Sequence, residues 1–423
     1  MAENHRVEYN WIKGVETLEE YQKGGYPPVM VGDVLHDRYL IADKLGFGGY
    51  STVWLARDTH LERYVAVKVN IADSLPHESK VLRALSTPTL SSSSVHPGRA
   101  LTPIIVDEFK IQGPNGEHNC YTMTPAQCNL REISFSRLFP LDVARALAYK
   151  LAQAVAYTHS QGYVHGYIHL KNILVKLPSS FDDLSIKQLY ETYGEPEAIL
   201  ITQCDCKPLP PNVPAKAVVP LFLGKYAESF SLSGAHPLLS DFGEAFSPAS
   251  EVRLGQDCHT PPAFRAPEAK FEPQTPLDYP LDIWSLATAI WEIIGMKSIF
   301  STDFVHEDEI VSQHIDVLGP MLPEWWQRWE GRHRFFDKYG YPTESHRENK
   351  WPTLKESFEI GVQKWRRKAG SEMTENEKAA FLDLMRRMLS FRPEERPTAE
   401  EVLLSDWMLK WALPDCRRSL KSF

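Results

Sequence analysis

The chain has 423 residues, of which 43% are hydrophobic and 24% charged, a composition typical of a folded protein with two unequal lobes or two domains. Its formal net charge of −9 argues against wholesale binding to nucleic acid and favours a basic protein or peptide as a partner. The N-terminus lacks the apolar core of a signal peptide, and no apolar run is long enough to span a membrane. Cys204 and Cys206 form a C-x-C, but no second pair stands at zinc spacing, so we expect reduced thiols and a cytoplasmic or nuclear location.

The first third of the chain is predicted to be rich in strands. Residues 1–30 are polar, contain the turn-rich KGGYPP, and are expected to form an extension on a first lobe. Residues 38–70 alternate apolar and polar side chains and carry glycines, which indicates β-hairpins. GPNGEH at 113–118 predicts a further hairpin turn. Between them, 75–86 has the apolar spacing of a helix, at Leu75, Val81, Leu82 and Leu85.

From residue 141 onward the pattern becomes helical. Residues 279–295 are apolar almost all round and predict a buried central helix, and 377–390 are amphipathic. Residues 177–236 interrupt this helical pattern and contain many prolines, which indicates a functional or partly disordered insert. The helix predicted over 141–160 has one apolar face, formed by Val143, Leu147, Leu151 and Val155.

The stretch LGFGGYSTVWLA places glycines where a hairpin could bend over phosphate groups. Its glycines match the pattern G-x-G-x-x-S-x-V, and glycine lets a backbone present N–H groups to phosphate oxygens. An ordinary glycine-rich hairpin is the alternative. The candidate nucleotide contacts in this stretch are Leu45, Gly46, Gly48, Ser51 and Val53.

Lys68 lies in the strand-like YVAVKV, where its ammonium could hold α- and β-phosphates. Taken alone, a surface lysine at a strand edge is the better interpretation. Glu78, in the next predicted helix, is its candidate partner.

The stretch CYTMTPA predicts a strand that leads into a hinge, with Met123 behind an adenine pocket and the backbone near Ala126 facing the base. A core methionine is the alternative for Met123.

The stretch VHGYIHLKNILV resembles the catalytic loop of phosphotransferases. This loop has the pattern H-R-D-L-x-x-x-N in protein kinases and H-G-D-x-H-x-x-N in small-molecule phosphotransferases. His165, His169 and Asn172 occupy their expected places, but Tyr167 stands where the catalytic aspartate is expected. Asp241 of SDFGEAF and Asn172 are the predicted Mg²⁺ ligands, because a carboxylate and an amide oxygen are the hard donors that suit this ion.

Later motifs complete an ordered set. Glu268 of RAPE and Arg396 of RPEERP are expected to form a buried ion pair, and Asp282 of DIWS is expected to hold the backbone of the catalytic-type loop. The glycine loop, strand lysine, catalytic-type loop, DFG, APE and DxWS follow the order of protein-kinase subdomains. The sequence therefore predicts an α+β, bilobal protein-kinase fold with a β-rich N-lobe and a mainly helical C-lobe. The expected divisions are an extension at 1–30, the N-lobe and hinge at 31–126, the C-lobe at 127–412 with a Pro-rich insert at 177–236, and a tail at 413–423.

The segment EEYQKGGYPPVMVGDVLHDRYLIADKLGFGGYSTVWLA resembles the opening segment of the SR-protein kinase family, and its fungal members most closely. That family also interrupts its kinase domain after the catalytic loop, where the insert at 177–236 falls. The resemblance covers about residues 19–412. It implies ATP and Mg²⁺ as cofactors and Arg/Ser-rich proteins as substrates. We expect a monomer that does not bind nucleic acid or membranes directly.

The acidic run Glu307, Asp308 and Glu309 stands ahead of a predicted helix and is similar to an acidic stretch of the same family. It is the candidate docking site for a basic substrate, and a solvated charged loop is the alternative. Gly166 replaces the arginine that usually meets a phosphorylated activation loop, which implies activity independent of that phosphorylation. The alternative is that glycine only suits a tight turn.

Tyr167 is the main departure from the family pattern. An aspartate there would orient the substrate hydroxyl and accept its proton, whereas a phenol with a reference pKa of about 10 is neutral at pH 7. General-base catalysis contributes roughly 10²–10⁴-fold, so we expect a weakened kinase. His169 stands where Ser/Thr kinases usually carry a lysine, and we interpret it as a family trait. A pseudokinase scaffold, a small-molecule phosphotransferase and a recent Asp-to-Tyr change in a working kinase are the alternatives.

Overall fold

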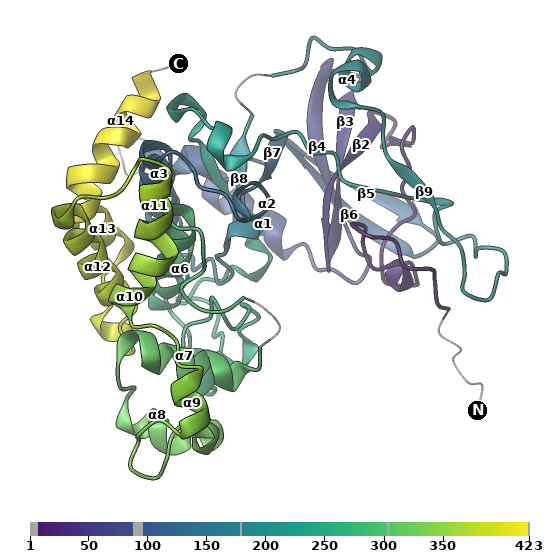
Figure 1. Ribbon diagram of the computed structural model, residues 1–423. Coiled ribbons are helices and arrows are strands. Elements are labelled where there is room, and N and C mark those ends of the chain that lie inside the picture. Colours follow the sequence, from purple (N-terminus) through teal and green to yellow (C-terminus); the bar gives the residue numbers. More distant parts are fainter. Residues whose placement is uncertain (1–6, 88–95, 178–179, 303–304, 422–423) are drawn as a thin grey trace, which may run out of the picture. The chain divides into compact units, whose positions relative to one another are not determined.

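A computed structural model of the protein describes residues 7–87, 96–177, 180–302 and 305–421 (Figure 1). The chain divides into two units. Unit 1 is rich in strands and unit 2 is mainly helical, as predicted for an α+β fold with a β-rich N-lobe and a mainly helical C-lobe. Unit 1 consists of Met1–Ser86, Pro103–Cys128 and Lys176–Gly224, and unit 2 of Thr87–Thr102, Asn129–Val175 and Lys225–Phe423.

Unit 1 is built on a six-stranded antiparallel sheet in the order β1-β2-β3-β4-β6-β5. This sheet confirms the hairpins predicted over 38–70 and the turn predicted at 113–118. One apolar cluster of the sheet includes Trp54, Val67 and Phe109. The strands are β1 (Val34–Leu35), β2 (Tyr39–Gly48), β3 (Ser51–Asp58), β4 (Arg63–Asn70), β5 (Asp107–Gly113) and β6 (Gly116–Met123), and β7 (Ala126–Asn129) follows.

Helix α1 (His77–Ser86) follows β4 and begins two residues later than the helical spacing suggested. Val81, Leu82 and Leu85 are buried as predicted. Leu75, which was expected to share this face, lies before the helix and is 80% exposed. The N-terminal segment that precedes the sheet contains one short 3₁₀ turn, Leu18–Glu20.

Most of the predicted insert is grouped with unit 1. It was expected as an interruption of the C-lobe over 177–236, but residues 176–224 belong to unit 1. They form α4 (Ile186–Tyr193), β9 (Ala198–Leu200) and β10 (Lys216–Val218), while residues 178 and 179 lie outside the described residues. The insert folds because it carries apolar side chains that bury against two parts of unit 1. Phe181, Leu189 and Leu223 pack with Ala42, Leu55 and Tyr64 of the sheet, and Ile201, Val213 and Ala217 pack with Leu18, Tyr21 and Tyr26 of the N-terminal segment.

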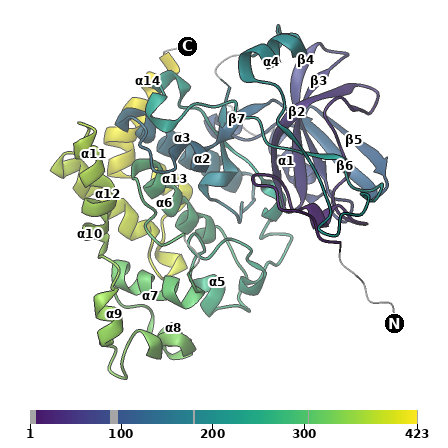
Figure 2. The same ribbon diagram turned by 45° about the vertical axis from the view of Figure 1, so that its right-hand side comes forward.

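Unit 2 is centred on α3 (Leu141–Ser160) and α6 (Pro280–Ile294), which contact each other (Figure 2). All but Pro280 of α6 is buried, as predicted for a central helix, and the apolar face predicted for α3 is also buried. The short strands β8 (Ile173–Lys176) and β11 (Pro237–Leu239) pair antiparallel. The other helices are α2 (Leu130–Ser134), α5 (Glu268–Phe271), α7 (Glu307–Leu318), α8 (Pro323–Arg328), α9 (Glu344–Glu348), α10 (Leu354–Phe358), α11 (Lys364–Lys368), α12 (Glu375–Met388), α13 (Ala399–Leu403) and α14 (Leu413–Lys421). None of the helices in the described residues is long and apolar enough to cross a membrane.

Candidate active site

The glycine-rich stretch forms the hairpin between β2 and β3. Gly48 pairs with Ser51 and Gly46 pairs with Val53, so the predicted loop residues lie on two facing strands. A Cβ added at Gly46 or Gly48 would meet no atom within 4 Å. Open space therefore lies beside the backbone at these two positions, on the side where a Cβ would stand, and phosphate groups need such space to approach it.

Lys68 lies on β4, across from Val53 of the hairpin. Its ammonium donates to a carboxylate oxygen of Glu78 on α1 over 2.6 Å, which confirms the predicted ion pair. The two side chains are 12% and 11% exposed, so the pair is largely shielded from water. Glu78 thus fixes where the Lys68 ammonium lies. Met123 ends β6 partly exposed, and Ala126 begins β7.

In unit 2, the carboxylate of Asp282 holds the catalytic-type loop by its backbone, as the sequence predicted. The amide of His165 donates to one oxygen over 2.6 Å and the amide of Gly166 donates to the other over 2.9 Å. Burial would raise the pKa of Asp282, but the hydrogen bond from His159 and the neighbouring histidines outweigh it, so the pKa lies below its ordinary value. Asp282 therefore remains an ionised acceptor at neutral pH.

Gly166 adopts a left-handed backbone with φ of 73°, and an added Cβ would lie 2.9 Å from the carbonyl oxygen of Glu244. Both observations favour glycine, because other residues are strained in this region. The hydroxyl of Thr260 donates to the carbonyl of Gly166 over 2.7 Å. Thr260 was not predicted as a site residue, and the only sequence signal for it is its place shortly before Glu268.

Tyr167 is half-buried and packs against the ring of His169. The amide nitrogen of Asn172 donates to the carbonyl of Tyr167 over 3.0 Å, which closes the loop on itself. Burial lowers the pKa of His169 to about 4, although Asp241 acts in the opposite direction. The position where Ser/Thr kinases usually carry a lysine therefore holds an uncharged imidazole near pH 7.

The structure brings the two predicted metal ligands onto adjoining segments. The amide and hydroxyl of Ser240 both donate to the carbonyl of Asn172, over 2.9 and 3.0 Å, so Asp241 directly follows a residue bonded to Asn172. Asp241 has a left-handed φ of 63°. Such a backbone costs on the order of 1–3 kcal/mol in a residue other than glycine and is found most often at functional sites.

These two residues fit a magnesium ion. Because the amide nitrogen of Asn172 is bonded to Tyr167, its amide oxygen is the atom left for a cation. Among the described residues, no cluster of three or more His, Cys, Asp or Glu side chains could form a complete metal cage. A site with an amide and a carboxylate suits Mg²⁺, which keeps waters and binds phosphate oxygens in addition to protein ligands.

The segment after Asp241 is held by charged contacts that were not predicted. Glu244 accepts from Arg253 over 2.9 Å and from His259 over 3.0 Å. The guanidinium of Arg265 donates to the carbonyl of Thr260 over 2.7 Å. These contacts order the segment without a phosphate group. The signal in the sequence is weak, because the partners are separated by nine to fifteen residues of irregular backbone.

Two further predictions concern charged pairs. Arg396 binds both oxygens of Glu268, each over 2.7 Å, which confirms the predicted buried ion pair.

The acidic run was expected ahead of a helix, but it forms the first turn of α7. The docking residues are also less available than the sequence suggested, because cations of unit 2 already pair with them. Glu307 binds Arg265 and Lys270, Asp308 accepts from the indole of Trp329 over 2.8 Å, and Arg334 lies within 3.9 Å of Glu309.

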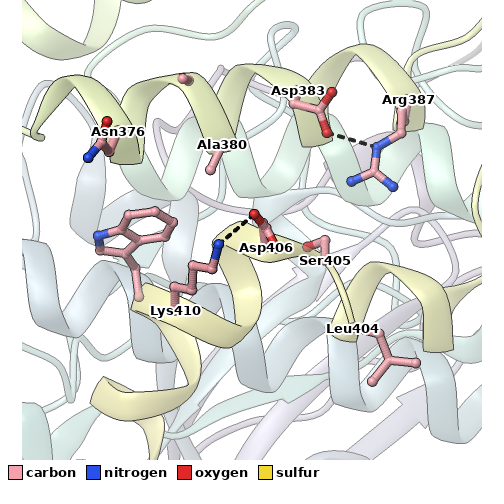
Figure 3. A pocket seen from close by; sticks show the side chains of 10 residues that line it. Asn376, Ala380, Asp383, Arg387, Leu404, Ser405, Asp406 and Lys410 are labelled. Atoms are coloured by element: carbon pink, nitrogen blue, oxygen red, sulfur yellow. Dashed lines mark hydrogen bonds and ion pairs between the residues drawn. The ribbon is translucent and has the colours of Figure 1, made fainter.

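A cavity of about 690 Å³ lies in unit 2 along α12 and the segment from Leu404 to Trp411 (Figure 3). Two ion pairs stand on its walls, between Asp383 and Arg387 and between Asp406 and Lys410. None of the predicted site residues lines it. It is therefore not the candidate active site.

Comparison with known proteins agrees with this geometry. Residues 232–408 match the model of the protein kinase domain family. The chain is 30% identical over 411 residues to a serine/threonine protein kinase of Aspergillus fumigatus, an alignment that covers 93% of this chain and 90% of the relative. It is 30% identical over 169 residues to human SRSF protein kinase 3, with 38% of this chain and 29% of the relative covered. A crystal structure of a kinase domain aligns with a TM-score of 0.62 at 16% identity, covering 90% of this chain and 98% of that one.

Proposed function

Because the chain belongs to the serine/threonine protein kinase family, we propose that it transfers the γ-phosphoryl group of ATP to serines of Arg/Ser-rich proteins, at a rate that Tyr167 reduces. The partial match to SRSF protein kinase 3 and the net charge of −9 support a basic, Arg/Ser-rich substrate. The observation that carries the proposal is the anchored catalytic-type loop, in which Asp282 holds the amides of His165 and Gly166.

Protein kinases use ATP and Mg²⁺, and each unit contains residues to which we assign part of this binding. In unit 1 the open backbone of Gly46 and Gly48 would face phosphates, and Lys68, oriented by Glu78, would bind them. In unit 2 Asn172 and Asp241 would hold the metal. When bound, Mg²⁺ would neutralise the charge that develops on the transferring phosphoryl group.

The role of Tyr167 follows from its chemistry. At this position an aspartate would orient the acceptor hydroxyl and take its proton, and a neutral phenol cannot accept that proton with comparable strength. The rest of the machinery acts by position and charge, which does not depend on the base. We therefore expect slow turnover, reduced by roughly 10²–10⁴-fold relative to an aspartate-containing loop.

A scaffold that binds ATP without turnover is the second candidate, and the single observation in its favour is Tyr167 itself. Phosphotransfer from radiolabelled ATP to an Arg/Ser-repeat peptide separates the two. The proposal expects slow incorporation that Asp241→Asn abolishes. Nucleotide binding without any incorporation above the Asp241→Asn background would favour the scaffold. Incorporation into small alcohols but not into the peptide would favour a small-molecule phosphotransferase.

A further inference from the structure

The N-terminal segment of unit 1 reaches the glycine-rich hairpin through one tyrosine. The hydroxyl of Tyr26 donates to the carbonyl oxygen of Gly48 over 2.7 Å. Tyr26 is 2% exposed, whereas Phe47 and Tyr50 of the same hairpin are 42% and 67% exposed. The tip of the hairpin thus projects into solvent, while a buried side chain holds one of its peptide groups.

Two glycines before Tyr26 bring its backbone close to the sheet. Gly24 has a φ of 89°, and an added Cβ would lie 2.2 Å from the Asp73 carboxylate. An added Cβ at Gly25 would lie 1.9 Å from the carbonyl oxygen of Glu20, so neither position accepts a side chain. The carbonyls of Gly24 and Gly25 accept from the amides of Asp73 and Ala72, just beyond β4. The two glycines therefore let the chain pass close enough to the sheet for Tyr26 to reach Gly48.

The same segment makes a second contact just before the glycine-rich stretch. Lys44, two residues before Gly46, forms a buried ion pair with Glu16, which also accepts from the hydroxyl of Tyr21. Lys44 and Glu16 are 0% and 3% exposed. The segment from Glu16 to Tyr26 thus binds β2 just before the glycine-rich stretch and again at Gly48, where the strand ends.

The insert also supports this segment. The side-chain amide of Asn212 donates to the carbonyl of Tyr21 over 2.7 Å. Asn115, at the β5–β6 turn, donates to the carbonyl of Tyr26 over 2.6 Å and to the carbonyl of Asn212 over 3.0 Å. The position of Tyr26 is therefore fixed by the insert and the sheet together, so its hydroxyl is held in place before any ligand binds.

The consequence for the hairpin follows from the planarity of the peptide bond. The carbonyl of Gly48 and the N–H of Gly49 belong to one plane and point in opposite directions in a trans peptide. A bond that fixes the Gly48 oxygen therefore fixes the direction of the Gly49 N–H. Burial raises the pKa of Tyr26 to about 12, with smaller contributions from Glu16 and Glu20, so the hydroxyl keeps its proton near pH 7.

We propose that Tyr26 is a positioning residue that orients the tip of the glycine-rich hairpin for the phosphates of the nucleotide. This inference rests on the proposed function, because it requires that the chain binds Mg·ATP. It assigns a role in phosphate binding to the N-terminal segment and to Asn212, the residue of the insert that supports this segment.

The test compares two tyrosine-to-phenylalanine variants. Tyr26→Phe removes the bond to Gly48, and Tyr190→Phe removes a matched phenol bond, 2.7 Å long, to the carbonyl of Ala42 on the same strand but before the glycine-rich stretch. Calorimetry would measure the affinity of each chain for Mg·ATP and for adenosine, which lacks phosphates. Tyr26→Phe should weaken Mg·ATP binding roughly threefold to tenfold and leave adenosine binding unchanged. Tyr190→Phe should change neither.

Hydrogen exchange supplies a readout that needs no nucleotide. Amides of residues 48–51 should exchange faster in Tyr26→Phe than in the wild-type chain or in Tyr190→Phe. Wild-type affinity for Mg·ATP in Tyr26→Phe, or an equal loss of ATP and adenosine binding, would overturn the inference and leave the proposed function standing. A wild-type chain that binds neither ligand would overturn both.

Discussion

Tyr167 packs edge-on against His169, with ring centroids 4.7 Å apart and ring planes at 73°. Ser/Thr kinases usually carry an aspartate and a lysine at these two positions. Here burial lowers the pKa of His169 to about 4, so both residues are uncharged near pH 7. Two neutral rings in contact thus replace a pair of opposite charges, while Asp282 and Asn172 still hold the loop around them. We propose that the expected loss of turnover comes from the chemistry at Tyr167 and not from the fold of the loop.

Nucleotide binding should survive this loss. Saturating Mg·ATP at about 100 times its dissociation constant should stabilise the folded chain by about 2.7 kcal/mol. Lys68→Ala should shrink this stabilisation, because it removes the cation that Glu78 orients. Lys110→Ala is the control, since Lys110 is an exposed lysine of the same sheet. A melting temperature that does not respond to millimolar Mg·ATP in the wild-type chain would contradict the prediction.

The acidic run at the start of α7 should divide into a docking residue and a structural residue. Glu309→Gln should weaken binding of an Arg/Ser-repeat peptide by a few fold at low salt and by less at high salt, because its carboxylate is 39% exposed. Asp308→Ala should instead lower stability, because it removes the carboxylate that accepts from the buried indole of Trp329. Fluorescence anisotropy and thermal melting measure the two effects. If Glu309→Gln bound the peptide with unchanged affinity, Glu309 would not be a docking residue.

His314 should make stability depend on pH. Burial, aided by Arg396, lowers the pKa of His314 to about 3, compared with about 6.5 in an unfolded chain. The unfolded chain binds the extra proton between these values. The contribution of neutral His314 to the free energy of unfolding is therefore fully present above pH 6.5. It falls by about 1.4 kcal/mol per pH unit as the pH drops toward 3.

Chemical denaturation at several pH values checks this expectation. His314→Phe keeps an aromatic ring among Trp284 and Phe300 and should flatten the dependence between pH 6.5 and 4. The exposed His333 gives the control, His333→Gln, which should leave the dependence unchanged. An equally steep dependence in His314→Phe would show that other groups are responsible.

The Glu268–Arg396 pair should contribute strongly to the stability of unit 2. Arg396→Ala would leave the mostly buried carboxylate of Glu268 without its partner, and breaking such a pair costs about 3–5 kcal/mol. Arg387→Ala removes an exposed pair with Asp383 and should cost less than about 1 kcal/mol. Urea denaturation compares the two variants, and equal losses would refute this prediction.

The parts of the molecule that the sequence predicted are those with local or motif-based signals. The period-2 and helical patterns located β2 to β4, α3 and α6, and motif spacing alone paired Lys68 with Glu78 and Asp282 with the loop backbone. The roles of Tyr26 and Asn212 could not be predicted in this way. Asn212 and Tyr21 are 191 residues apart, and no periodicity links such distant partners.

The docking residues show a second limit of sequence reasoning. Three consecutive acidic residues suggest a free negative surface, but Arg265 and Lys270 lie within 3.1 Å of Glu307 in the folded chain. The charge of a surface depends on which cations the fold brings beside it. The insert shows the same limit, since its prolines indicated an irregular segment while its dispersed apolar residues bury against the sheet of unit 1.

The proposal that Tyr167 alone limits turnover is tested by the turnover number of Tyr167→Asp with an Arg/Ser-repeat peptide, measured beside that of the wild-type chain. The affinity for Mg·ATP is determined for both chains. A carboxylate at this position would again orient the acceptor serine and take its proton, so kcat should rise by roughly 10²–10⁴-fold, or about 3–5 kcal/mol of barrier. The affinity for Mg·ATP should barely change, because this residue is expected to face the acceptor. A Tyr167→Asp variant that binds Mg·ATP but remains inert would contradict the account, as would a wild-type chain that already turns over as fast as the variant.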